Sequence, residues 1–112
     1  MPELESLDEF QYHHRLKETG GIALVLFSSP TCGTCRVVEG RLPREAPAGV
    51  RLFKVDAQLS PALARALEVF HLPALFLYRD GEYHAPLDCE ISTPALNSAL
   101  TAALAAPARE EP

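Results

Sequence analysis

Two cysteines separated by two residues provide the most informative chemistry in this chain, in the stretch Cys32-Gly33-Thr34-Cys35. An uninterrupted apolar run over residues 22–27 comes shortly before them and is typical of a buried strand. We therefore expect the pair where a strand gives way to a helix. The N–H groups and positive dipole end of a helix N-terminus lower the pKa of a thiol, and the thiolate is the form that attacks a disulfide.

The same cysteine spacing also occurs in zinc sites. A tetrahedral zinc site would need two further ligands, and Cys89 and His71 carry suitable donor atoms. Structural zinc sites usually show two paired ligand clusters, whereas this chain has one pair. We therefore expect thiol redox chemistry and no metal.

Length and composition place the pair in one folded domain. The 112 residues suffice for a single core, and 47% of them are hydrophobic. The apolar runs are far too short to span a membrane, and the acidic start lacks the features of a secretory signal. We expect one domain over residues 1–105, a flexible tail over residues 106–112, no membrane partner and a cytoplasmic location. In a reducing cytoplasm such a pair is more often catalytic, redox-sensing or metal-binding than structural.

Charge argues against a nucleic-acid partner. The net charge is −5, whereas nucleic-acid-binding surfaces are basic. Several basic residues nevertheless follow the cysteines, beginning with Arg36. They indicate either ordinary solvated surface or a mildly basic rim beside the pair.

Strand and helix signals alternate along the chain. Ser6 and Glu9 fit a capping box, which predicts a helix over residues 7–18 with Leu7, Phe10 and His14 on its buried side. Strands are predicted over residues 22–27, 51–56, 74–79 and 82–87. The last two are joined by a turn at residues 80–81, and a proline at residue 86 places the final strand at a sheet edge.

Three more helices are predicted. The helix at the cysteines should be short, because Gly40 and Pro43 interrupt it. Ser60 and Thr93 are the expected N-caps of the other two helices. Their core-facing positions are expected to be Leu63, Leu67, Phe70, Leu96, Leu100 and Leu104. The order of elements describes an α/β sandwich that ends in a hairpin.

Five landmarks together resemble the thioredoxin family over almost the whole chain. They are, in order, Leu24-Val25-Leu26-Phe27, Cys32-Gly33-Thr34-Cys35-Arg36, Val55-Asp56, Leu72-Pro73 and Phe76-Leu77-Tyr78-Arg79-Asp80-Gly81-Glu82. Their order and spacing are far more specific than a cysteine pair alone. The resemblance implies the thioredoxin fold, a three-layer α/β/α sandwich with a mixed four- or five-stranded sheet.

The resemblance also implies roles for individual residues. Cys32 would be the exposed attacking thiol, and Cys35 the buried thiol that resolves the mixed disulfide. Pro73 matches the family's cis-proline, which faces the dithiol. The backbone of Leu72 would then pair with an extended substrate segment.

Two further residues fall near the implied substrate-docking surface, which also includes Gly33 and Thr34. Cys89 occupies a position that is usually glycine. It is either a small apolar residue that fills this site or a third redox cysteine. His71, two residues before the proline, is either a passive exposed histidine or a modulator of the thiolate.

The chain departs from the family pattern around the dithiol. Thr31 stands where thioredoxins carry tryptophan, and Leu26 stands where they carry a buried carboxylate that helps move a proton to or from the second thiol. Without that carboxylate, deprotonation of Cys35 should be slower. Thr34 replaces a proline, and its N–H and hydroxyl should stabilise a Cys32 thiolate. The disulfide would then be more oxidising, and a shift of about 30 mV requires only ~1.4 kcal/mol.

The sequence therefore predicts a thiol–disulfide oxidoreductase that acts on disulfide-containing protein substrates without a bound cofactor. Its electrons would come from a partner reductase or another thiol donor. The missing tryptophan and carboxylate argue against coupling to an ordinary thioredoxin reductase. They also leave an alternative open, a redox-responsive adaptor or chaperone-like module whose dithiol reports oxidation state with little turnover.

Overall fold

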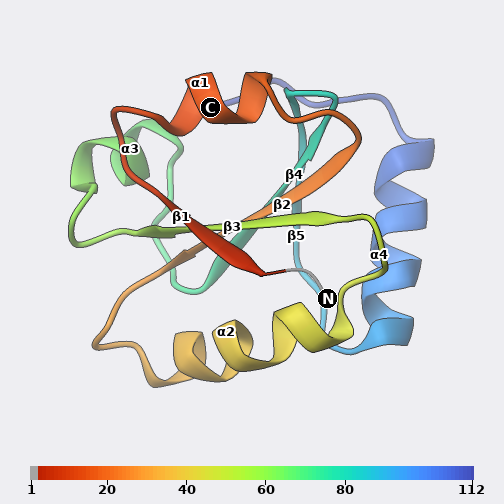
Figure 1. Ribbon diagram of the computed structural model, residues 1–112, viewed down its shortest axis with the longest axis horizontal. Helices are drawn as coiled ribbons and strands as arrows, with labels where there is room; N and C mark the ends of the chain where they lie inside the picture. Colours follow the sequence, from red (N-terminus) through yellow and green to blue (C-terminus); the bar gives the residue numbers. More distant parts are fainter. Residues whose placement is uncertain (1–2) are drawn as a thin grey trace.

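A five-stranded mixed sheet lies between two layers of helices in the computed structural model, which describes residues 3–112 (Figure 1). The strands are β1 (Leu4–Leu7), β2 (Ile22–Ser28), β3 (Arg51–Asp56), β4 (Ala74–Arg79) and β5 (Glu82–Leu87). The helices are α1 (Tyr12–Lys17), α2 (Gly33–Glu45), α3 (Pro61–Ala66) and α4 (Thr93–Ala105). The strand order is β1-β3-β2-β4-β5, with β1, β3 and β2 parallel and with β4 antiparallel to both of its neighbours. This arrangement confirms the expected three-layer sandwich.

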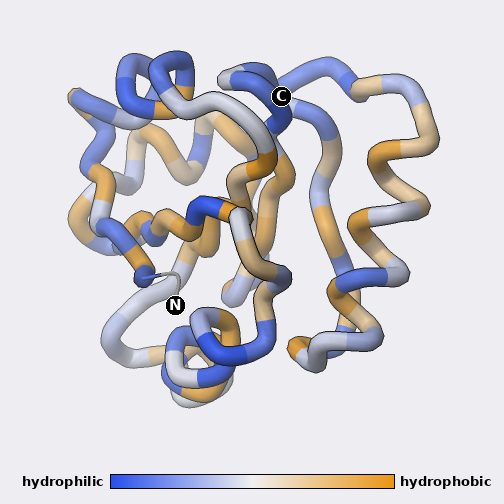
Figure 2. Tube along the Cα trace, turned by 45° about the vertical axis from the view of Figure 1, so that its right-hand side comes forward, coloured by the Kyte–Doolittle hydropathy of each residue, from blue (hydrophilic) through white to orange (hydrophobic). Residues whose placement is uncertain are grey.

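The sheet has a separate hydrophobic core on each face. Helices α1 and α3 cover one face through Tyr12, Leu16, Leu63, Ala64 and Leu67. Helices α2 and α4 cover the other through Val38, Leu42, Leu96 and Leu100. Strand β2 is buried from its second residue to its last, as expected for a central strand with helices on both sides. Figure 2 shows hydrophobic residues in the strands and on the inward face of α4. Among residues 3–112, no helix has the length and apolar character that a membrane crossing needs.

The β4–β5 hairpin turns through two residues in the left-handed region, Asp80 at φ 51° and Gly81 at φ 84°. This is the backbone that a two-residue Asp-Gly turn adopts, so the predicted turn is confirmed. Asp80 Oδ1 accepts a hydrogen bond from the Gly21 N–H at 2.8 Å, which ties the hairpin to the start of β2. Pro86 lies in β5, which is an edge strand as predicted.

The predicted first helix is wrong at its N-terminal end. Residues 4–7 form β1, which pairs in parallel with β3, so Ser6 lies in a strand and caps no helix. Asp8 instead organises the turn into α1, because its Oδ1 accepts hydrogen bonds from the Phe10 and Gln11 N–H groups. The helix begins only at Tyr12. Its buried residues are therefore Tyr12 and Leu16, whereas Phe10 and His14 are exposed.

Helix α2 is longer than predicted, with 13 residues that include both Gly40 and Pro43. Proline removes one backbone hydrogen bond, and glycine lowers helix propensity by about 1 kcal/mol relative to alanine. The buried side chains of Val38 and Leu42 hold the helix against the sheet and outweigh both effects. The Arg44 Nε group also donates to the Gly40 carbonyl at 3.3 Å.

Two details of the later helices also differ from prediction. Helix α3 ends at Ala66, and Glu68 adopts a left-handed φ of 56° just beyond it. Phe70 is therefore outside the helix and 76% exposed, so the prediction that it faces the core is wrong. The N-cap of α4 is Ser92, whose hydroxyl accepts from the Ala95 N–H, one residue before the predicted cap.

The last seven residues form no helix or strand but contact the rest of the molecule. The Arg109 N–H donates to the His84 carbonyl at 2.8 Å, and the Glu111 carboxylate contacts the His13 ring. Both contacts place the tail across the ends of α1 and β5. The flexibility of residues 106–112 remains a prediction.

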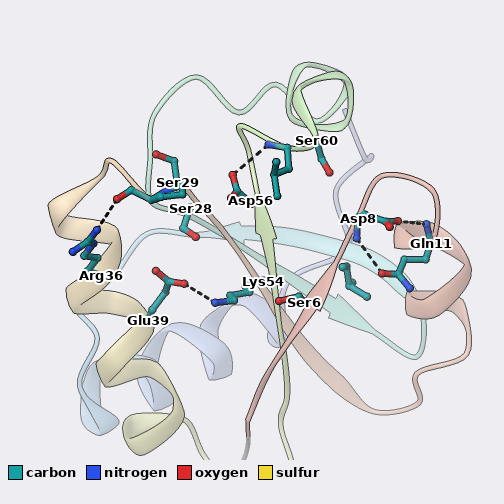
Figure 3. Close-up of a pocket in the computed structure, with 13 residues that line it drawn as sticks. Ser6, Asp8, Gln11, Ser28, Ser29, Arg36, Glu39, Lys54, Asp56 and Ser60 are labelled. Carbon is teal, nitrogen blue, oxygen red and sulfur yellow. Dashed lines mark hydrogen bonds and ion pairs between the residues drawn. The ribbon is translucent and has the colours of Figure 1, made fainter.

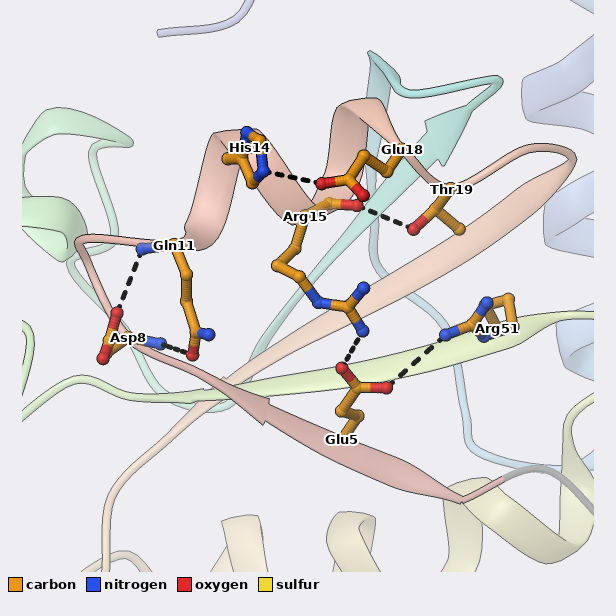
Figure 4. A network of polar contacts seen from close by, with 8 residues as sticks. All are labelled: Glu5, Asp8, Gln11, His14, Arg15, Glu18, Thr19 and Arg51. Carbon is orange, nitrogen blue, oxygen red and sulfur yellow. Dashed lines mark hydrogen bonds and ion pairs between the residues drawn. The ribbon is translucent and has the colours of Figure 1, made fainter.

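Strand β1 is held at the sheet edge by a surface charge network (Figure 4). The Glu5 carboxylate contacts the guanidinium groups of Arg15 in α1 and Arg51 in β3. One acidic residue therefore bridges the edge strand, its neighbour and the helix above them. Exposed ion pairs contribute little to stability because solvent screens them, so the network adds to the burial of Leu7 rather than replacing it.

We predict that Gly81→Ala destabilises the protein by about 1–3 kcal/mol, because alanine is strained at a positive φ. Its Cβ would also lie 2.9 Å from the Lys17 Cα and carbonyl oxygen at the end of α1. Urea unfolding measures the change. Gly40→Ala is the matched control, because its Cβ would meet nothing within 4 Å and the residue is helical. This control should gain up to about 1 kcal/mol. Equal stability of Gly81→Ala and the wild type would contradict the role assigned to the turn.

Candidate functional site

The two cysteines lie where β2 ends and α2 begins, as their position in the sequence predicted. Cys32 is the N-cap of α2, with extended backbone angles, and its N–H donates to the Ser29 carbonyl at 3.2 Å. The loop before it is braced by an Arg36 guanidinium that donates to the Pro30 carbonyl at 3.1 Å. Thr31 is exposed in this loop, and its Oγ1 lies 3.0 Å from Ser29 Oγ. Thr31 and Arg36 therefore hold the loop that presents Cys32.

Cys32 and Cys35 form a disulfide, with their Cα atoms 5.2 Å apart. The two sulfurs differ in environment, because Cys35 is 0% exposed whereas Cys32 is half-buried. The Cys35 N–H donates to Cys32 Sγ at 3.1 Å. When the pair is reduced, this N–H and the N-terminal end of α2 stabilise negative charge on Cys32. The geometry therefore distinguishes an attacking sulfur from a buried one.

Gly33 and Thr34 form the exposed first turn of α2. No acidic residue lies in this turn to oppose a thiolate at the N-cap. A Cβ at Gly33 would meet nothing within 4 Å, so the surface beside Cys32 is open. Both residues are accessible to a partner that approaches Cys32.

An apolar cavity of about 260 Å³ lies beside α2 and the start of β4. It is lined by Leu26, Val38, Pro73, Ala74, Leu75, Leu87, Asp88, Cys89 and Ile91. Pro73 and Cys89, predicted on one surface from the sequence, thus share a cavity with Val38, one turn after Cys35. The Leu72–Pro73 peptide bond is cis, and Leu72 is half-buried against the core on the α1 face.

Cys89 is half-buried and packs against the core beneath α2 and α4. Burial and the neighbouring Asp88 carboxylate raise the pKa of the Cys89 thiol above its ordinary value. A raised pKa lowers the thiolate population at neutral pH, so this sulfur is a weaker nucleophile than an unperturbed thiol.

His71 and the cysteines were also considered as ligands of a metal ion. His71 is exposed in the loop before Pro73. Among residues 3–112, no group of three or more His, Cys, Asp or Glu side chains is arranged to hold a metal ion. His71, Cys89 and the cysteine pair therefore do not form such a group in the described part of the chain.

Sequence reasoning missed a polar pocket on the other side of α2. This pocket of about 560 Å³ lies at the carboxyl ends of the parallel strands β1, β3 and β2 (Figure 3). Its lining includes Arg36 and Glu39 of α2, Lys54 and Asp56 of β3, and Ser28 of β2. The signal in the sequence was the polar residue that ends each of β2 and β3, Ser28 and Asp56, because parallel strands bring their carboxyl ends to one edge.

Comparisons with known proteins agree with this geometry. The chain matches the sequence profile of the Thioredoxin family over residues 3–102. It is 31% identical over 65 residues to the thioredoxin of Staphylococcus saprophyticus subsp. saprophyticus, a match that covers 55% of this chain and 62% of that protein. The match therefore spans less than two thirds of this relative.

Solved structures show the same fold at low sequence identity. The zinc-bound form of human ERp44 has a TM-score of 0.76 at 20% identity, covering 89% of this chain and 32% of that one. A chain from a structure on the thiol resolving mechanism in yeast mitochondrial 1-Cys peroxiredoxin via glutathione/thioredoxin systems has a TM-score of 0.69 at 20% identity. That likeness covers 92% of this chain and 95% of the other. The profile match, the fold and the cysteine pair together show that this chain belongs to the thioredoxin family.

Proposed function

We propose that this protein is a thiol–disulfide oxidoreductase that reduces disulfides of protein substrates through Cys32-Gly33-Thr34-Cys35. Family membership and the cysteine pair support redox chemistry in general. One observation supports turnover in particular. The pair combines a half-exposed sulfur at a helix N-cap with a fully buried sulfur one turn later, and turnover needs both environments.

The chemistry follows from this difference. The Cys32 thiolate attacks one sulfur of a substrate disulfide, and the other substrate sulfur leaves as a thiolate that takes up a proton. The Cys35 thiolate then attacks Cys32 Sγ, releases the second substrate sulfur and forms the Cys32–Cys35 disulfide. Two electrons pass from the protein to the substrate in each cycle. A reductase or other thiol donor must return them, and no bound cofactor takes part.

The substrate would lie across the exposed first turn of α2 and the loop before β4. Gly33 and Thr34 leave room beside Cys32, and the backbone of Leu72 would offer hydrogen-bonding groups to a substrate segment. Pro73 would shape the groove between them, and His71 and Cys89 would lie at its border. A reducing compartment such as the cytoplasm would keep the dithiol ready to act.

A redox-responsive adaptor is the alternative, and one observation favours it. Leu26 is 1% exposed, so the sheet beneath α2 offers an apolar side chain at the position where the family resemblance implies a carboxylate. An adaptor needs reversible oxidation of the pair but no rapid resolution. A measurement of turnover therefore distinguishes an oxidoreductase from an adaptor.

We predict that the protein catalyses insulin reduction by dithiothreitol and that Cys32→Ser abolishes the catalysis, because the attacking sulfur is lost. Cys35→Ser should instead accumulate mixed disulfides with substrates, since Cys32 still attacks but no thiol resolves the product. Turbidity measures the turnover, and non-reducing electrophoresis with mass spectrometry identifies the trapped adducts. Reversible oxidation of the wild type without turnover would support the adaptor instead.

We predict a disulfide less reducing than that of ordinary thioredoxins, because the Thr34 N–H and hydroxyl lie in the first turn beside Cys32. Equilibration with glutathione buffers, followed by alkylation of free thiols, measures the potential. Thr34→Pro is the matched variant, because it removes both donors, and it should lower the potential by about 30 mV or more. A wild-type value at or below the thioredoxin range would contradict this explanation.

We predict that Cys89 reacts with iodoacetamide more slowly at neutral pH than Cys32 in the reduced protein. Its raised pKa leaves little thiolate, and the difference should shrink as the pH rises through the Cys89 pKa. Mass spectrometry of alkylated peptides over a pH series measures both rates. Cys89→Ser should retain the insulin turnover of the wild type. Loss of turnover in this variant would instead assign Cys89 a redox role.

A further inference from the structure

The resolving sulfur is enclosed by apolar groups on its sheet side. Cys35 is 0% exposed and Leu26 is 1% exposed, and Val38 and Leu42 continue the same buried face of α2. A thiol must lose its proton before it attacks a mixed disulfide. Burial opposes this loss, because a charged sulfur is disfavoured in an apolar environment. The reaction proposed above therefore needs a proton acceptor near Cys35.

Glu39 is the carboxylate that α2 itself places nearest to this turn. It follows Cys35 by four residues, so the two side chains are neighbours on the same flank of the helix. Helical side chains tilt toward the N-terminus, which directs Glu39 back over the turn that contains Cys35. The Glu39 side chain is 26% exposed, which places it between the core and solvent.

Lys54 fixes the position of this carboxylate. Lys54 Nζ donates to Glu39 Oε1 at 3.0 Å (Figure 3). Lys54 is also the register partner of Leu26 in the parallel β2–β3 pair, so both side chains project from the same face of the sheet. The ion pair therefore lies one strand away from the leucine that occupies the position of the missing carboxylate.

The polar pocket connects Glu39 with solvent. Glu39 and Lys54 line it together with Ser28, which lies two residues after Leu26 on the same face of β2. The hydroxyls of Ser28 and Ser60 are in residues that are 5% and 2% exposed. Both residues line the pocket. Such hydroxyls are suited to hold water, which carries protons between a carboxylate and bulk solvent.

We infer that Glu39 accepts the proton of Cys35 during resolution and passes it to water in the polar pocket. This inference rests on the proposed function, because it concerns the second step of that reaction. The Cys35 S–H bond breaks and a proton moves to the Glu39 carboxylate, directly or through one water. The Cys35 thiolate then forms a bond to Cys32 Sγ as the substrate sulfur leaves. The charged groups that line the pocket beside Glu39 are Arg36, Lys54, Asp56 and Asp8, and Asp88 lies at the apolar cavity.

The two thiol steps can be timed in one experiment on the full chain in a Cys89→Ser background. The reduced protein is mixed with the aromatic disulfide DTNB in a stopped-flow instrument. Attack by Cys32 releases the first thionitrobenzoate, and attack by Cys35 on the resulting mixed disulfide releases the second. Glu39→Gln keeps the size of the side chain and an oxygen that accepts from Lys54, but it removes the base. Glu45→Gln, on the same helix and paired with Arg41 at 4.0 Å, is the matched control.

We expect Glu39→Gln to slow the second release about tenfold or more at neutral pH and to leave the first release unchanged. The deficit should shrink as the pH rises, because hydroxide from bulk solvent then deprotonates the thiol without the carboxylate. Glu39→Asp should restore most of the rate, and Glu45→Gln should match the parent. An unchanged second release in Glu39→Gln, a deficit that does not vary with pH, or an equal deficit in Glu45→Gln would overturn the inference. Insulin turnover by the wild-type protein tests the proposed function separately, because it does not depend on the comparison of variants.

Discussion

The packing of α2 against the sheet is the constraint on which the site depends. Val38 and Leu42 are anchored in the core beneath the helix, and this contact fixes which side of the first turn faces inward. Because Cys35 precedes Val38 by three residues, it lies on the same inward side and is fully buried. Cys32, at the N-cap, is left at the rim. One helix orientation thus produces two sulfurs of different exposure from two identical side chains.

Burial of Cys35 keeps that sulfur out of contact with solvent, and in the proposed reaction this burial has a cost. An enclosed thiol is a poor acid, so the apolar surroundings that protect it also slow the step it must perform. In this chain the neighbouring strand β2 provides Leu26, whose apolar side chain cannot stabilise a charge on Cys35. Proton transfer then depends on groups outside the immediate core, and the flank of α2 toward β3 is where such groups occur. Stabilisation of the Cys32 thiolate at the N-cap of α2 and proton transfer from Cys35 therefore depend on different groups on two sides of this helix.

Much of this architecture followed from local sequence patterns, and the failures have physical causes. The buried strands were predicted to within a residue, because continuous apolar runs between turn signals have few alternative structures. Strand β1 was missed, and Ser6 was predicted to be a helix N-cap, because a capping-box pattern does not reveal that β3 has a free edge to pair with. Helix α2 passes Pro43 because tertiary packing outweighs local propensity. The cysteine pair was identifiable from its spacing, and Pro73 from the resemblance to the thioredoxin family. The contact between Glu39 and Lys54 was not, because it depends on the register of two strands and the rotation of a helix above them.

The apolar cavity and the polar pocket beside α2 suggest why this thioredoxin-family site can carry leucine at residue 26, where the family resemblance implies a buried carboxylate. The cavity toward β4 is lined mainly by apolar residues, including Pro73, and the exposed Asp88 is the acidic residue of its lining. The pocket toward β3 is polar, and its lining includes charged groups and two buried hydroxyls. Leu26 lines the apolar cavity but not the polar pocket, so a leucine at this position leaves the charged lining of the polar pocket unchanged. Cys35 therefore lies between a cavity lined mainly by apolar residues and a polar pocket, and in the proposed reaction a carboxylate on the helix would serve proton transfer without being buried in the sheet.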